Sequence, residues 1–225
     1  MAGERFRFSF FSLESVQHHF LTFMNITKTV FTVGHTIPNF EMETYDPAEK
    51  QFDTISLDKL KSLGRWTVLF FYPADFTFVC PTELADLADK QAALKEMNIE
   101  VVSVSCDTKY AHLAWRNSEK LLQNVNYQMA ADPTGTVARM FGVYDDATGL
   151  ALRGTFIIDP DGKLVSSEVN YYNLGRDVAE LARKLEAFVY LRDHPEEACP
   201  AKWKRGSKTL TPSAKLVGQV YDALQ

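Results

Sequence analysis

The stretch of the chain with the clearest chemical potential is residues 73–83, which read PADFTFVCPTE. Cys80 follows an apolar run and directly precedes Pro81, a residue suited to the first helical position because its missing N–H would be unpaired there anyway. The free N–H groups and the dipole of a helix N-terminus favour negative charge. Because the thiolate is the nucleophilic form of cysteine, this position predicts reactive sulfur chemistry at Cys80.

Glu83 sets a condition on that chemistry. It lies three residues after Cys80, where the acid of a capping box would stand, and its charge opposes a thiolate unless a cation from elsewhere in the chain offsets it. Glu83 also stands where a thioredoxin-type Cys-x-x-Cys motif would carry its second sulfur, so any disulfide partner of Cys80 must be distant in sequence. The alternative interpretation is that Cys80 is only a small buried hydrophobic residue.

The elements that must position these residues are predicted from periodicity and turn signals. Residues 66–72 form a β-branched and aromatic run, read as a buried strand, and apolar residues at helical spacing follow Pro81. A DPDG turn at residues 159–162 indicates a hairpin. The other expected strands are 99–105, 127–131, 152–158 and 163–169, and the other expected helices are 110–122, 178–189 and 213–224. Strands alternating with helices and ending in a hairpin and a helix indicate an α/β fold with a mixed sheet.

Composition narrows the class of protein. A length of 225 residues suits one domain with extensions, and 46% hydrophobic with 24% charged residues is ordinary for a soluble globular protein. The net charge of −5 gives no indication of nucleic acid binding. Three cysteines, an odd number, favour a reducing compartment, expected to be the cytoplasm, over a secreted disulfide framework. No segment approaches the roughly 18 apolar residues of a membrane span.

The chain is expected to have three parts. Residues 1–27 are an N-terminal extension without the features of a signal peptide; we interpret residues 1–23 as a mis-assigned start, with Met24 the real one, or as disordered. An added edge strand or a partner contact is the alternative. Residues 28–191 form the folded domain. Residues 192–225 form a C-terminal arm, which carries Cys199 in an accessible position.

Four segments resemble a known family. Pro73, Thr77 and Cys80 reproduce the P-x-x-x-T-x-x-C motif of peroxiredoxins, and residues 75–83 resemble the typical 2-Cys class, the alkyl hydroperoxide reductase C type. The segment RGTFIID that begins at Arg153 resembles the arginine-bearing strand of that family. CPAKW, which begins at Cys199, resembles its resolving-cysteine segment. The resemblance extends from about residue 30 to residue 215.

This resemblance implies a thioredoxin-like fold and the reduction of hydrogen peroxide and organic hydroperoxides. Cys80 is then the peroxidatic thiolate, and Arg153 is the cation that offsets Glu83 and stabilises the thiolate and the peroxide oxygens. Thr77 hydrogen-bonds the peroxide, and Pro73 shields the sulfur from water.

The resemblance also implies the partners. The Cys80 sulfenic acid condenses with Cys199 of the other subunit of a homodimer, which assembles into a decameric ring. An external dithiol system, either thioredoxin or a partner flavoprotein or adaptor, reduces the disulfide again. The reaction needs no metal or cofactor, and the five histidines show no metal-ligand spacing.

Two departures from some family members predict resistance to inactivation by excess peroxide. Residues 120–133 contain no Gly-Gly-Leu-Gly insertion, and the terminal helix contains no Tyr-Phe pair. In the family these features slow disulfide formation and favour overoxidation.

Three other residues are interpreted as packing groups rather than as catalysts or ligands. They are Cys106, at a strand end, and His112 and Trp115, three apart on one helix face, where they serve packing or an interface. Two other functions are alternatives to the peroxidase. One is a ring-forming holdase or redox-signalling scaffold with incidental peroxidase activity. The other is a cysteine hydrolase, which lacks the required histidine near Cys80.

Overall fold

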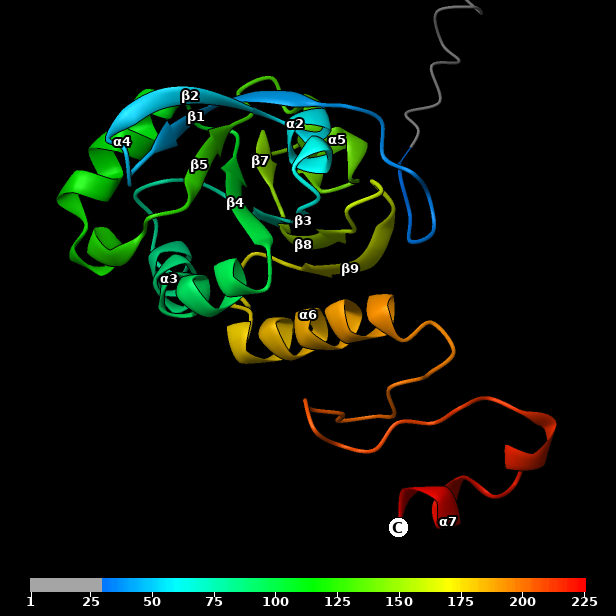
Figure 1. Cartoon of the computed structure of the whole chain (residues 1–225). Helices are drawn as coiled ribbons and strands as arrows, with labels where there is room; N and C mark the ends of the chain where they lie inside the picture. The colour runs from blue at the N-terminus through cyan, green and yellow to red at the C-terminus, as the bar shows by residue number, and fades with distance from the viewer. Residues whose placement is uncertain (1–29) are drawn as a thin grey trace, which may run out of the picture.

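The computed structural model describes residues 30–225 and builds them around a mixed sheet of seven strands in the order β2-β1-β5-β4-β3-β8-β9 (Figure 1). The strands of this sheet are β1 (Glu41–Asp46), β2 (Gln51–Ser56), β3 (Trp66–Phe71), β4 (Ile99–Ser105), β5 (Gln128–Ala131), β8 (Arg153–Ile158) and β9 (Leu164–Asn170). The helices are α2 (Leu57–Ser62), α3 (Cys80–Glu96), α4 (Lys109–Ser118), α5 (Thr136–Met140), α6 (Val178–Asp193) and α7 (Val220–Leu224). A mixed sheet with flanking helices confirms the predicted α/β class.

The central strand β3 shows how the sequence builds the two layers of the core. All six of its residues are buried, as the apolar run predicts for a strand covered on both faces. Val68 and Phe70 pack into one apolar cluster together with side chains of α3 and α6. Leu69 and Phe71 pack into a second cluster with side chains of α2 and α5. Figure 1 shows these two helix pairs on opposite sides of the sheet.

Several element boundaries differ from the predictions. The helix expected over residues 110–122 ends at Ser118, because Glu119 is extended and its carboxylate accepts the backbone N–H of Leu121, which starts the 3₁₀ helix η1 (Lys120–Asn124). The helix expected over residues 213–224 is two short pieces, η2 (Ala214–Leu216) and α7, separated at Gly218, whose φ is +77°. The sequence analysis did not predict the hairpin β1–β2 or helix α2. It also did not predict the two-stranded sheet formed by β6 (Tyr144–Asp145) and β7 (Leu150–Ala151).

The C-terminal arm leaves the domain after α6, which extends two residues beyond the boundary predicted at residue 191. Figure 1 shows the arm, coloured orange to red, on the outer side of α6. Its main anchor is Trp203, which is 2% exposed and packs on Tyr190 of α6 with 5.0 Å between the rings. Among residues 30–225, no helix combines the length and the apolar character needed to cross a membrane. The N-terminal extension predicted over residues 1–27 lies outside the described residues.

Candidate active site

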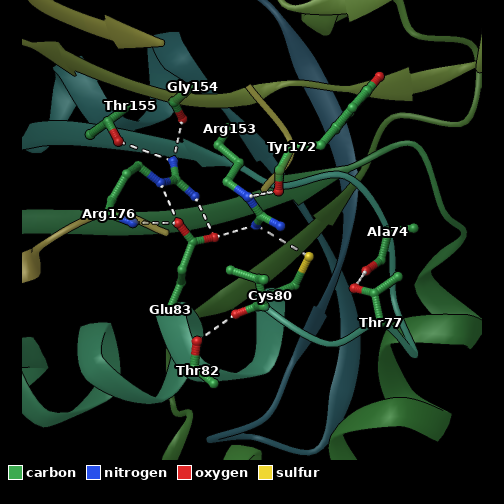
Figure 2. Close-up of polar contacts among 11 residues, drawn as sticks. Ala74, Thr77, Cys80, Thr82, Glu83, Arg153, Gly154, Thr155, Tyr172 and Arg176 are labelled. Atoms are coloured by element: carbon green, nitrogen blue, oxygen red, sulfur yellow. Dashed lines mark hydrogen bonds and ion pairs between the residues drawn. The ribbon is translucent and has the colours of Figure 1, made fainter. Parts of the chain in front are cut away.

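The loop from β3 to α3 places Cys80 at the first residue of a 17-residue helix (Figure 2). Pro81 stands in the first turn, as predicted, and no side chain caps this end of the helix. The loop is tightened by the Thr77 hydroxyl, which donates to the Ala74 carbonyl oxygen at 2.8 Å. Cys80 is fully buried, Pro73 is buried and Thr77 is half-buried. The predicted strand–loop–cysteine–helix arrangement is therefore present, with the sulfur enclosed by protein.

Arg153 reaches the sulfur because β8 lies beside β3. The two strands are antiparallel, so the first residues of β8 lie at the same edge of the sheet as the last residues of β3. The Arg153 Nη1 atom donates to Cys80 Sγ at 3.4 Å and to Glu83 Oε2 at 2.5 Å. Its Nε atom donates to the Tyr172 carbonyl oxygen at 2.7 Å, which fixes the guanidinium. The cation that the sequence required thus lies against both the thiol and the acid.

Glu83 has a second cationic partner, Arg176, which the sequence analysis did not identify. The backbone N–H and Nε of Arg176 donate to Glu83 Oε1, each at 2.9 Å, and its Nη2 donates to Oε2 at 3.1 Å. Although Glu83 stands at the position of a capping-box acid, its buried carboxylate is held by the two arginines. Only the resemblance pointed to Arg153, and no local signal pointed to Arg176, which is 93 residues from Glu83.

The Arg176 guanidinium makes further contacts besides those with Glu83. Its Nη1 donates to the Gly154 carbonyl oxygen at 2.9 Å and to Thr155 Oγ1 at 3.0 Å (Figure 2). Its guanidinium carbon lies 3.4 Å from the centre of the Phe70 ring. Burial lowers the pKa of Arg176, and the hydrogen bond and charge of Glu83 oppose that shift. An arginine nevertheless stays charged in a protein.

The formal charges of this cluster favour one more anion. Arg153 and Arg176 carry two positive charges and Glu83 carries one negative charge, so the buried cluster has a net charge of +1 without the sulfur. A thiolate at Cys80 brings the sum to zero. Since an uncompensated buried charge is costly, the cluster is suited to negative charge that develops beside the sulfur.

A second buried cluster of polar side chains contacts the loop that precedes Cys80. The Asp75 carboxylate accepts the Tyr72 hydroxyl at 2.7 Å and lies 2.8 Å from His112 Nδ1, while His112 Nε2 lies 3.1 Å from the Ala130 carbonyl oxygen. Burial raises the pKa of Asp75, and the hydrogen bond and charge of His112 oppose the shift. His112 and Trp115 are both buried, which confirms their interpretation as packing groups.

The other two cysteines lie in different surroundings. Cys106 packs against the cluster that contains Leu69, and burial, aided by the charges of Asp132 and Asp107, raises the pKa of its thiol to about 12. This confirms that Cys106 is a packing residue. Cys199 is half-buried in the arm, and all three thiols are free within one chain. The arrangement therefore brings together Cys80, Glu83 and Arg153, with Thr77 and Pro73 in the adjoining loop, but leaves Cys199 outside.

Comparison with known proteins identifies the family to which the chain belongs. The chain belongs to the AhpC/TSA family, whose sequence profile matches residues 33–167. The alkyl hydroperoxide reductase C of Staphylococcus aureus is 48% identical to it over 188 residues, which are 84% of this chain and 98% of the relative.

Solved structures of similar proteins support the same family and fold. The structure of AhpC from Enterococcus faecalis is 43% identical and has a TM-score of 0.70, covering 75% of this chain and 98% of its own. The reduced 2-Cys peroxiredoxin of Plasmodium vivax is 31% identical with a TM-score of 0.79, covering 85% of this chain and 99% of its own. The thioredoxin-like peroxiredoxin fold and the thiol peroxidase activity predicted from the sequence are thereby confirmed.

Proposed function

We propose that Cys80 is the peroxidatic residue of a two-cysteine cycle that reduces hydrogen peroxide and organic hydroperoxides. The thiolate attacks one peroxide oxygen, the O–O bond breaks, and water or an alcohol leaves with a proton, so that Cys80 becomes a sulfenic acid. The single observation that carries the proposal is the contact of Arg153 Nη1 with Cys80 Sγ at 3.4 Å, in a cluster with a net positive charge.

The same proposal assigns a role to each of the neighbouring residues. Arg153 stabilises the thiolate and the negative charge that develops on the leaving oxygen. Glu83, held by Arg176 as well, fixes the orientation of the Arg153 guanidinium. The Thr77 hydroxyl, now donating to the Ala74 carbonyl oxygen, is placed to turn toward a bound peroxide, and buried Pro73 keeps water from the sulfur.

We propose that Cys199 of a second copy of the chain resolves the sulfenic acid. Cys80 is fully buried, so the first turn of α3 must open before its sulfur meets another thiol. Next to the site, β9 is an edge strand of the sheet. Its exposed Val169 and the following Tyr171 and Leu174, which are 44%, 71% and 64% exposed, offer an apolar surface that a second copy would cover.

A second apolar surface supports assembly beyond a dimer, as in the predicted decameric ring. Phe76 and Phe78, in the loop that precedes Cys80, are 59% and 92% exposed. We expect Phe78→Asp to reduce the assembly to a dimer in analytical ultracentrifugation while leaving the far-UV circular dichroism unchanged. The same large assembly in wild type and variant would refute this part of the proposal.

The names of the relatives support the remaining assignments. An alkyl hydroperoxide reductase C implies an alkyl hydroperoxide substrate and a separate reductase component, so we propose an external dithiol system, thioredoxin or a partner flavoprotein or adaptor, as the reductant. We propose the cytoplasm as its location, where thiols are kept reduced.

Resistance to overoxidation also remains a proposal. It is supported by α7, a five-residue helix with no buried residue, which lies away from α3 in Figure 1 and does not brace its first turn. Turnover in millimolar peroxide is expected to leave Cys80 mostly free of sulfinic acid by intact mass; rapid sulfinylation would contradict this.

The deciding experiment treats reduced wild type and Cys199→Ser with one equivalent of peroxide and compares non-reducing gels and intact masses. Wild type is expected to give a dithiothreitol-reversible band near twice 25.5 kDa, and the variant a monomer that has gained one oxygen. A wild-type monomer with an oxidised Cys80 would keep the peroxidase and remove Cys199 from the cycle. An unreacted Cys80 would overturn the whole assignment.

A further inference from the structure

The arm carries Cys199 at the base of a closed loop. The Ala198 N–H donates to the Leu210 carbonyl oxygen at 2.8 Å, and the Leu210 N–H donates to the Ala198 carbonyl oxygen at 3.0 Å. This pair of backbone hydrogen bonds closes residues 199–209 into a loop, and Cys199 is its first residue. The thiol therefore cannot move far from α6 unless the Ala198–Leu210 bridge opens.

One carboxylate joins the base of this loop to the domain. Glu197 Oε2 accepts the hydroxyl of Tyr190, on α6, at 2.8 Å, and also accepts the hydroxyl of Thr209. Tyr190 belongs to the helix, Glu197 precedes the loop and Thr209 is its last residue. These two hydrogen bonds lower the pKa of Glu197, so the group is a carboxylate at neutral pH. Hydrogen bonds to a charged acceptor are stronger than those between neutral groups.

The far part of the loop is anchored on the same helix. Trp203 packs on Tyr190, its indole N–H donates to the Ser207 carbonyl oxygen at 3.2 Å, and Arg183 Nη1 donates to the Trp203 carbonyl oxygen at 3.1 Å. The loop is thus held on α6 at two places. The Trp203 anchor combines ring packing with hydrogen bonds, whereas the Glu197 anchor consists of two hydrogen bonds at the base of the loop, two residues before Cys199.

We propose that Tyr190, Glu197 and Thr209 form a latch that limits how fast Cys199 reaches the oxidised Cys80. They are positioning residues, and this inference rests on the proposed role of Cys199. In the step concerned, the Cys199 thiol is oxidised and the Cys80 sulfenic acid is reduced: the S–S bond forms, the S–O bond breaks, and the thiol proton leaves with the hydroxyl as water. A disulfide needs Cα atoms roughly 4.4–6.8 Å apart. Because the Ala198–Leu210 bridge holds Cys199 at the base of a loop on α6, we infer that this bridge opens before the two sulfurs meet.

The test removes one donor to Glu197 at a time. Tyr190→Phe keeps the ring that packs on Trp203, and Thr209→Val keeps the shape of the side chain; Tyr221→Phe and Thr211→Val are matched controls on exposed residues of the arm. Stopped-flow tryptophan fluorescence with increasing peroxide separates the bimolecular oxidation of Cys80 from the unimolecular formation of the disulfide. We expect each latch variant to accelerate the unimolecular phase about tenfold, the equivalent of about 1.4 kcal/mol, with the bimolecular phase unchanged.

Hydrogen exchange provides the second measurement. The amides of Ala198 and Leu210 should exchange faster in both latch variants than in the controls, because they close the loop. A disulfide phase that is unchanged or slower in both latch variants overturns the latch. A wild type that forms no intersubunit disulfide overturns the proposed function itself, so the two failures are distinguishable.

Discussion

The two sulfurs of the proposed cycle lie in regions built in opposite ways. Cys80 is fully buried at the start of a 17-residue helix, and its cation is fixed by a buried carboxylate and a backbone carbonyl. Cys199 is half-buried in a loop that is anchored on α6 by hydrogen bonds of Arg183 and Tyr190. The first region belongs to the core of the domain, whereas the second is attached to its outer side (Figure 1).

This difference matches what each step requires. Attack on a peroxide develops negative charge on the leaving oxygen. A rigid site, whose dipoles and charges are already in place, stabilises this charge without having to rearrange. Disulfide formation requires one thiol to travel, which favours a segment held by few contacts that can open locally. Changes near Cys80 should therefore affect oxidation and the stability of the fold, and changes near Cys199 should affect resolution alone.

The largest expected effect comes from Arg153→Met. Removing this donor is expected to lower the bimolecular rate with peroxide by about 10²–10³-fold, as removal of a single charge-stabilising donor does in other enzymes. Glu83 would keep Arg176 as its partner, so the chain should still fold, although the loss of one buried ion pair lowers its stability as well. Stopped-flow oxidation measures the rate, with Arg192→Met, on an exposed arginine paired with Asp161, as the control. A rate close to that of wild type would show that the charge cluster does not drive the reaction.

The next effect is on stability. Arg176→Met leaves the buried Glu83 carboxylate with one arginine, and breaking a buried ion pair costs about 3–5 kcal/mol. In a domain of this size that corresponds to a fall in Tm on the order of 10 °C. Thermal unfolding by circular dichroism measures it. Lys184→Met removes a part-exposed ion pair with Glu168 and should change stability by less than about 1 kcal/mol. Equal losses in the two variants would mean that the Glu83 cluster contributes no special stability.

Arg176 also shows where prediction from sequence ends. The strand, the loop and the helix around Cys80 were predictable because hydrophobic periodicity, a proline and a dipole act over a few residues. The contacts of Glu83 were not, because its partners lie 70 and 93 residues away and meet it only when the sheet and α6 have formed. The same limit applies to α4, which ends where the Glu119 side chain caps the next turn instead of continuing the helix.

A smaller effect is expected from pH on the resolving step. Burial and the charge of Glu197 raise the pKa of the Cys199 thiol, and Arg183 opposes that shift. Because the thiolate is the better nucleophile, disulfide formation should accelerate as pH rises above the usual thiol range of about 8.5. Arg183→Gln should move this acceleration to higher pH. The unimolecular phase, followed by stopped flow from pH 6 to 10, measures it; a profile that the variant leaves unchanged would exclude the arginine from this role.

The smallest effect is expected at the third sulfur, which belongs to neither region. Burial and the charges of Asp132 and Asp107 raise the pKa of the Cys106 thiol to about 12, although the charge of Arg139 opposes that shift. At neutral pH it is therefore a protonated packing group, so Cys106→Ser should change both kinetic phases by less than about twofold, and stability by about 1 kcal/mol. Iodoacetamide labelling at pH 7, followed by peptide mass spectrometry, should modify Cys199 well before Cys106. Labelling of Cys106 as fast as Cys199 would mean that burial and charge do not keep the Cys106 thiol unreactive.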